Sequence, residues 1–141
     1  MINRRDDFYM SVAINAAKES HAVRAKVGAV IAKNDNIISY GWNGMPAGMD
    51  NVCEYADNGI LITKPECLHA ETNAIAKLAK TNGGAINSTM YVTLSPCISC
   101  ANLIKAVGIA RVVYKDQYRL TNGIDFLRHN LNVEIEQINT P

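Results

Sequence analysis

The feature that most constrains how this chain can fold is a pair of short segments that each place metal ligands at a predicted helix start. The first is "HAE" at residues 69–71, and the second is "SPCISC" at residues 95–100. A Cys-x-x-Cys pair alone is compatible with a redox couple, half of a structural zinc knuckle or part of a catalytic metal site. If both segments serve one site, the fold must bring two helix starts together.

The second segment has the local chemistry of a helix start. Ser95 is a favourable N-cap and Pro96 suits the first helical turn, so Cys97 and Cys100 are predicted at the beginning of a helix. Side chains three residues apart lie on the same side of a helix. The positive end of the helix dipole lowers thiol pKa values and so favours thiolates. The segment therefore predicts two metal ligands on one surface.

The first segment supplies the rest of a catalytic zinc site. One imidazole, from His69, and two thiolates balance the charge of Zn²⁺ and leave its fourth tetrahedral position open to water. Zinc makes such a water acidic near neutral pH, and Glu71 is predicted to accept its proton and deliver it to the substrate. A redox pair would leave His69 and Glu71 without a role, so catalytic zinc is favoured over a redox couple and over a structural knuckle.

The periodicity of apolar residues places these segments in an alternating order of helices and strands. Residues 43–66 have no clear period and are predicted to form a long functional loop. The order predicts an α/β sandwich with a mixed sheet, in one domain over residues 1–141. The predicted helices are 5–20, 69–80, 97–107 and 121–130, and the predicted strands are 27–33, 36–42, 88–94, 109–115 and 132–138.

Composition limits the partners that this chain can have. The chain has 141 residues, of which 48 % are hydrophobic, and this is enough to form one hydrophobic core. Lys and Arg number 14 against 13 for Asp and Glu, and this near balance gives no long-range electrostatic attraction to long nucleic acid. No stretch reaches the ~20 apolar residues of a membrane span, and "MINRRDDFYM" lacks a signal-peptide core. We expect a cytoplasmic protein with no membrane contact, in which the four cysteines are thiols or metal ligands.

The combination His-x-Glu…Pro-Cys-x-x-Cys is similar to the signature of the cytidine deaminase-like zinc deaminases. Within that superfamily the chain resembles the deoxycytidylate (dCMP) deaminases over about residues 8–137. The zinc motif specifies only the superfamily, whereas "GWNGMPAG", the insertion after it and "HAETNAI" point to the dCMP branch. The other matching stretches are "VGAVIAKNDNIISY", "MYVTLSPCISCANLIKAVGIARVVY" and "DQYRLTNGIDFL".

This resemblance implies both an architecture and an activity. The fold would be a three-layer α/β/α sandwich with a mixed five-stranded sheet. The reaction would be hydrolysis of dCMP to dUMP and ammonia, which feeds thymidylate synthesis. The assembly would be a homohexamer, activated by dCTP and inhibited by dTTP, with Mg²⁺ bound beside the effector.

The resemblance also assigns residues. Zinc would be held by His69, Cys97 and Cys100, with Glu71 as the proton shuttle. Asn43 matches a residue that contacts the substrate sugar, and Tyr118 matches a tyrosine near the substrate. The family's regulatory motif falls on Gly41, Trp42, Asn43 and Gly44, where Trp42 replaces the usual tyrosine and leaves the effector preference open.

Further substrate contacts are predicted from chemistry alone. Arg24 and Lys26 precede the first strand and are candidate phosphate partners, although each is equally well explained as a solvated loop charge. Tyr118 has the alternative of a half-buried aromatic at the sheet edge. Backbone groups near Ala70 and Ser95 are candidates to orient the edge of the base.

Three other functions remain open from the sequence. A tRNA adenosine deaminase shares several of the patterns, but it usually has a shorter segment than the 26 positions from Asn43 to His69 and needs a basic surface. A deaminase of free cytidine would keep the same zinc chemistry. A catalytically silent zinc-binding interaction module would keep the fold without needing Glu71.

Two cysteines lie outside the predicted catalytic site. Some phage relatives carry a second, structural zinc in this region, and His21, Cys53 and Cys67 could supply three ligands. Only His129, near the C-terminus, is left as a fourth. We therefore expect one catalytic zinc per subunit and two buried thiols at Cys53 and Cys67.

Overall fold

The central element of the structure is a five-stranded mixed sheet, seen in a computed structural model that describes residues 2–139. The strand order is β2-β1-β5-β6-β7, in which β2-β1-β5 are antiparallel and β5-β6-β7 are parallel. The strands are β1 (Gly28–Lys33), β2 (Asn36–Trp42), β5 (Thr89–Leu94), β6 (Arg111–Asp116) and β7 (Glu134–Gln137). The predicted mixed five-stranded sheet is confirmed.

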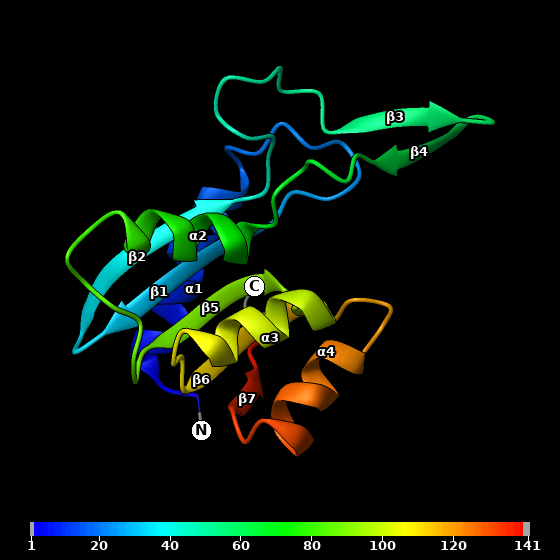
Figure 1. The fold of residues 1–141 in the computed structure, drawn as a ribbon. Helices are drawn as coiled ribbons and strands as arrows, with labels where there is room; N and C mark the ends of the chain where they lie inside the picture. Colours follow the sequence, from blue (N-terminus) through cyan, green and yellow to red (C-terminus); the bar gives the residue numbers. More distant parts are fainter. Residues whose placement is uncertain (1, 140–141) are drawn as a thin grey trace.

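Helices cover both faces of this sheet (Figure 1). On one face, α1 (Arg4–Ala17) buries Met10 and Ala13 against strand residues such as Val30 and Val113. The other face carries α2 (Ala70–Ala79), α3 (Ile98–Ala106) and α4 (Asn122–Asp125), the last continued by a π-helical turn η1 (Phe126–Asn130). Since β1 is buried on both faces, it reads as the apolar run "GAVIA" rather than an alternating pattern. The fold is the predicted three-layer α/β/α sandwich.

Local backbone chemistry fixes the connections between these elements. Asn34 and Asp35 both have positive φ angles, 52° and 62°, as a tight hairpin between β1 and β2 requires. Gly108, with φ of 89°, ends α3 in the left-handed conformation that glycine adopts without strain. Both turns lie where the predicted elements end, between the strands predicted over 27–33 and 36–42 and after the helix predicted over 97–107. Among residues 2–139, no helix combines the length and the apolar character needed to cross a membrane.

The prediction of a loop over residues 43–66 is only partly correct. It contains a second, two-stranded sheet, β3 (Glu54–Asp57) paired with β4 (Ile60–Thr63), which projects from the body of the molecule in Figure 1. The turn between them is Asn58-Gly59, with φ angles of 51° and 78°. Asn-Gly between two β-prone runs is the strongest short hairpin pattern. The signal was therefore present in the sequence and was missed.

A buried ion pair ties α1 to the sheet. The Asp6 carboxylate accepts hydrogen bonds from the Tyr91 hydroxyl at 2.6 Å and from Arg111 Nη1 at 2.9 Å and Nη2 at 3.0 Å. It also accepts the Asn3 N–H and so completes a capping box at the start of α1. Burial by itself raises the pKa of the Asp6 carboxyl, but these hydrogen bonds lower it to about 2.

Asp6 should therefore give the fold a pH-dependent stability. Its folded pKa lies below the unfolded value of 3.8, so the stabilisation is present above pH 4 and is lost as the pH falls toward 2. The Asp6 side chain is only 1 % exposed, and the shift corresponds to about 2 kcal/mol. We expect Asp6→Asn to lower the free energy of unfolding in urea by at least that amount at pH 7, with a smaller difference at pH 3. Asp7→Asn, at an exposed neighbour, is the control, and an equal loss in both variants would contradict the assignment.

Candidate active site

The three predicted metal ligands meet between the N-terminal ends of α2 and α3. His69 is the residue before α2 and Cys97 is the residue before α3, both with extended backbone, while Cys100 lies in the first turn of α3. The Nδ1 atom of His69 is 3.3 Å from the Sγ atom of Cys100 and 3.5 Å from that of Cys97. Within residues 2–139, this is the one group of three His, Cys, Asp or Glu side chains whose possible metal-binding atoms all lie within 4.8 Å of one another.

This donor set fits a zinc ion. At its usual bond lengths, tetrahedral zinc separates a nitrogen from a sulfur ligand by roughly 3.5 Å, close to both distances. Hydrogen bonds from Cys100 and His69 lower the pKa of the Cys97 thiol to about 3, so one thiolate is ready for a metal. The shared proton and burial raise the pKa of Cys100, which must lose that proton when an ion binds. The hydrogen bond to Cys97 likewise raises the pKa of His69.

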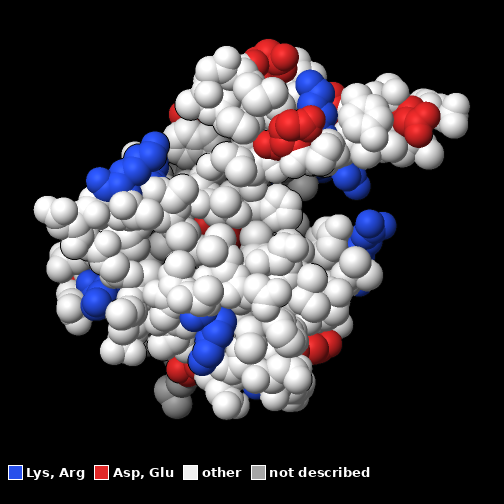
Figure 2. Space-filling model, viewed as in Figure 1, with Lys and Arg blue, Asp and Glu red and all other residues white. Residues whose placement is uncertain are grey.

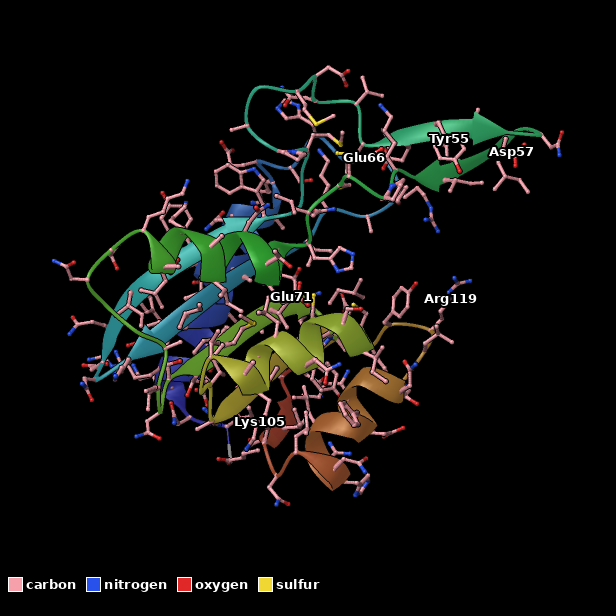
Figure 3. All side chains as sticks on the ribbon, in the orientation of Figure 1. Tyr55, Asp57, Glu66, Glu71, Lys105 and Arg119 are labelled. Atoms are coloured by element: carbon pink, nitrogen blue, oxygen red, sulfur yellow. The ribbon has the colours of Figure 1, made fainter. Side chains whose placement is uncertain are left out.

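Glu71 is the buried carboxyl group beside these ligands. It is the second residue of α2 and is 4 % exposed, and Figure 3 shows it in the space between the starts of α2 and α3. Burial raises the pKa of its carboxyl group to about 7, against the opposing effects of its own backbone N–H and of His69. Because His69 precedes the helix rather than belonging to it, the two-residue spacing does not force the two side chains apart.

A cavity of about 270 Å³ opens beside Glu71 and the ligands. Most of the residues predicted from the sequence line it, although Cys100 is buried behind it. Lys26 is the exception among the predicted substrate contacts, because it lines a separate hollow with Lys115 and Asp116. The predicted residues in the cavity wall are Arg24, Asn43, His69, Ala70, Glu71, Ser95, Cys97 and Tyr118.

Two polar residues of the cavity hold neighbouring segments in place. The Asn43 side chain accepts the Val27 N–H and donates to the Ala25 carbonyl, both at 2.8 Å, and so fixes the loop before β1. The hydroxyl oxygen of Ser95 accepts the Tyr118 N–H at 2.7 Å. Ser95 is not the N-cap of α3, as the sequence suggested. That position belongs to Cys97, because the Ser95 hydroxyl bonds the loop after β6 instead.

Sequence reasoning missed the contribution of the hairpin to this cavity. Glu54 of β3 and Thr63 of β4 both line it. The Glu54 carboxylate is nearly buried and accepts the N–H groups of Val23 and Arg24, at 2.8 and 3.0 Å. The Asn-Gly turn could have revealed the hairpin, but no local pattern indicates that its base reaches the pocket.

The residues of the predicted regulatory motif lie at the end of β2. Gly41 packs directly under α2, where a Cβ atom would come within 2.6 Å of the Ala74 nitrogen. Trp42 stacks on Tyr40, and the Lys77 ammonium group lies 3.5 Å from the centre of the Tyr40 ring and 5.6 Å from that of Trp42. Gly44 forms a backbone bridge with Leu68. The motif thus links the edge of the sheet to the segment that carries His69.

Cys53 and Cys67 are buried together with Ala22 in a small apolar cluster under the hairpin. Burial and the neighbouring Cys53 thiol raise the pKa of Cys67 to about 11, which disfavours a thiolate. His21 is exposed. The absence of a second zinc stays a prediction, which metal analysis can test.

Comparisons with known proteins agree on one family. The model of the cytidine and deoxycytidylate deaminase zinc-binding region matches residues 3–116. The deoxycytidylate deaminase of Enterobacteria phage T4 is 35 % identical over 89 % of this chain and 86 % of its own length. The human deoxycytidylate deaminase is 37 % identical over 82 % of this chain and 70 % of its own length.

Solved structures agree with the sequence comparisons. The dCMP deaminase from cyanophage S-TIM5, solved in complex with dCMP and dUMP, superposes with a TM-score of 0.90 at 39 % sequence identity. The match covers 98 % of this chain and 99 % of the other. The residues matched by the family's zinc-binding region, 3–116, include His69, Cys97 and Cys100, whose donor atoms lie together in the structure. The chain therefore belongs to the cytidine and deoxycytidylate deaminase family of enzymes, and within it to the deoxycytidylate deaminases.

Proposed function

We propose that this protein catalyses the zinc-dependent hydrolysis of dCMP to dUMP and ammonia. The observation that carries the proposal is a group of three zinc donors, His69, Cys97 and Cys100, beside a cavity that the buried carboxyl group of Glu71 also lines. Glu71, with a pKa near 7, can both accept and return a proton at neutral pH. The relatives named deoxycytidylate deaminase support dCMP as the substrate.

The reaction replaces the amino group on C4 of cytosine with oxygen. Zinc, held by His69, Cys97 and Cys100, would supply a water molecule that is acidic near neutral pH. The Glu71 carboxylate would accept a proton from the attacking water and pass it to N3 of the ring as the water oxygen bonds to C4. It would then move the remaining hydroxyl proton to the amino group, so that ammonia leaves as the C4–N bond breaks and the C4=O bond forms. Burial of Glu71 keeps bulk water away from this proton transfer.

The cavity wall offers groups for the other parts of the nucleotide. Ala70 and Ser95 line the same cavity as Glu71, and we propose that their backbone groups orient the amide edge of the base. Asn43, Tyr118 and Arg24 line this cavity as well, and in the proposal Asn43 and Tyr118 would contact the sugar while Arg24 would bind the phosphate.

A substrate panel tests this proposal. The protein is incubated with dCMP, deoxycytidine, cytidine and an anticodon stem-loop RNA that contains adenosine, and released ammonia is measured. We expect dCMP to be the preferred substrate. Preference for a nucleoside, or for the RNA, would replace dCMP by that alternative, and bound zinc without any ammonia would indicate the silent interaction module. Protein treated with a zinc chelator is the control.

Regulation and assembly form the finer part of the proposal. We propose a cytoplasmic homohexamer that dCTP activates and dTTP inhibits, each with Mg²⁺, through the motif Gly41, Trp42, Asn43 and Gly44. The aromatic pair Tyr40 and Trp42, with Lys77 over both rings, is a surface on which a nucleotide base and phosphate could bind. Repeating the dCMP measurement with each effector tests the regulation, and the molar mass in solution tests the hexamer.

A further inference from the structure

Asn73, in the first turn of α2, is a polar residue that the proposed reaction does not use. Its side-chain Nδ2 atom donates a hydrogen bond to the Trp42 carbonyl at 2.7 Å, and its backbone N–H donates to the His69 carbonyl at 3.0 Å. It therefore joins the end of β2 to the residue that carries the imidazole ligand. We propose that Asn73 is a positioning residue, which holds the start of α2 so that His69 and Glu71 face the metal in the correct orientation. The inference rests on the proposed function, because it concerns the same zinc site.

His69 has little support from its own helix. It is the N-cap residue of α2, with extended backbone, and its side chain makes no capping hydrogen bond. The first turn of a helix leaves backbone N–H groups without partners inside the helix, and helix ends fray. The orientation of the imidazole must therefore be fixed by contacts that come from outside α2.

The end of β2 holds the chain on both sides of His69. On the preceding side, Gly44 and Leu68 exchange two backbone hydrogen bonds, at 3.0 and 2.8 Å. On the following side, the Asn73 side chain is bound to the last residue of β2. The imidazole ligand and the carboxyl group of Glu71 both lie between these two attachments, so the end of β2 fixes them together.

A glycine makes the second attachment possible. Helix α2 lies against β2 (Figure 1), and a Cβ atom at Gly41 would come within 2.6 Å of the Ala74 nitrogen and 2.9 Å of the Ala70 carbonyl oxygen. Because glycine has no Cβ atom, the backbones of the strand and the helix can approach this closely. The close approach brings the Trp42 carbonyl within reach of the short Asn73 side chain.

The groups that this contact orients lie at the cavity. Figure 2 shows acidic atoms inside the hollow between α2 and α3, with uncharged side chains directly around them, and Figure 3 labels Glu71 there. A rotation of the first turn of α2 would move the imidazole and this carboxyl group at once. Contacts that orient metal ligands from outside typically change metal affinity or activity 10- to 100-fold when they are lost. We therefore expect Asn73 to affect both metal binding and turnover.

Removing the Asn73 amide tests the inference on the metal itself. We expect Asn73→Ala to weaken zinc binding about tenfold, measured by competition with a coloured chelator. With Co²⁺ in place of zinc, the visible absorption spectrum should change, because it depends on the geometry of the ligands. The kcat for dCMP should fall by a similar factor with KM little changed, since Asn73 does not line the cavity. Asn73→Asp, which keeps the shape but cannot donate to a carbonyl, should behave like Asn73→Ala.

The matched control is Ser39→Ala. The Ser39 hydroxyl, on β2, donates to the Ala74 carbonyl of α2 at 2.6 Å, so this variant also removes one hydrogen bond between the same two elements. A helix carbonyl points toward the C-terminal end of its helix, which for α2 is away from His69. We expect Ser39→Ala to lower the melting temperature while zinc affinity and the Co²⁺ spectrum stay unchanged.

Three results would overturn the inference. The first is an unchanged zinc affinity and Co²⁺ spectrum in Asn73→Ala, whatever its melting temperature. The second is an equal change in Ser39→Ala, which would point to a general loosening of α2. The third is normal metal binding in Asn73→Asp. The metal measurements need no turnover, so a wild-type protein that binds zinc but does not deaminate dCMP would count against the proposed function and not against the role of Asn73.

Discussion

Replacing Glu71 by alanine should abolish nearly all turnover while leaving the zinc in place. This carboxyl group is buried beside the metal ligands and lines the cavity, and the proposed reaction needs it to move protons to both N3 and the amino group. General acid–base catalysis of this kind contributes about 100- to 10,000-fold to the rate. We therefore expect kcat for dCMP to fall by that factor, with zinc content near one ion per subunit. Ammonia release and metal analysis of the same sample measure both.

Two further variants make this result specific. Glu71→Gln keeps the size of the side chain but cannot accept a proton, so it should be nearly as inactive as Glu71→Ala. Glu66→Ala removes a carboxylate that is exposed and lies on the hairpin side of the molecule in Figure 3, and it should retain full activity. Near-normal turnover in Glu71→Ala would show that another group moves the protons.

Removing a metal ligand should have a larger and different effect, because zinc and activity are lost together. In Cys97→Ala or His69→Ala, two ligands remain where zinc sites in enzymes use three. We expect zinc to fall well below one ion per subunit and dCMP turnover to become undetectable. The melting temperature should fall as well, because an ion that binds only the folded state stabilises it.

The remaining thiols provide the control for this experiment. Cys53→Ala removes a buried sulfur that lies outside the ligand group, and we expect it to keep one zinc per subunit. Retention of zinc by Cys97→Ala would contradict the proposed ligand set. A wild-type content of two ions per subunit would instead show that Cys53 and Cys67 take part in a second site.

The structure corrects the sequence prediction at three places, and each has a physical cause. The hairpin over 54–63 was missed because its strands are short and only the Asn-Gly turn indicated them. Serine is a favourable N-cap residue, but the Ser95 hydroxyl accepts the Tyr118 N–H instead. The N-cap is therefore Cys97, and α3 begins at Ile98. Lys26 stands in the sequence between Ala25 and Val27, which line the cavity, yet Lys26 itself lines a separate hollow with Lys115 and Asp116.

The sequence by itself determined the strands of the main sheet, the helices that cover it and the candidate metal ligands of this protein. Turn residues and apolar periodicity act locally, so the main helices and strands could be placed within a few residues. The candidate ligands His69, Cys97 and Cys100 could be identified because zinc binds imidazole nitrogen and thiolate sulfur, and the two segments that carry these groups read as helix starts. Tertiary structure alone decided which loops share the cavity. Glu54, Thr63 and Tyr118 come from segments with no common sequence pattern, and only the tertiary fold places all three in the wall of one cavity.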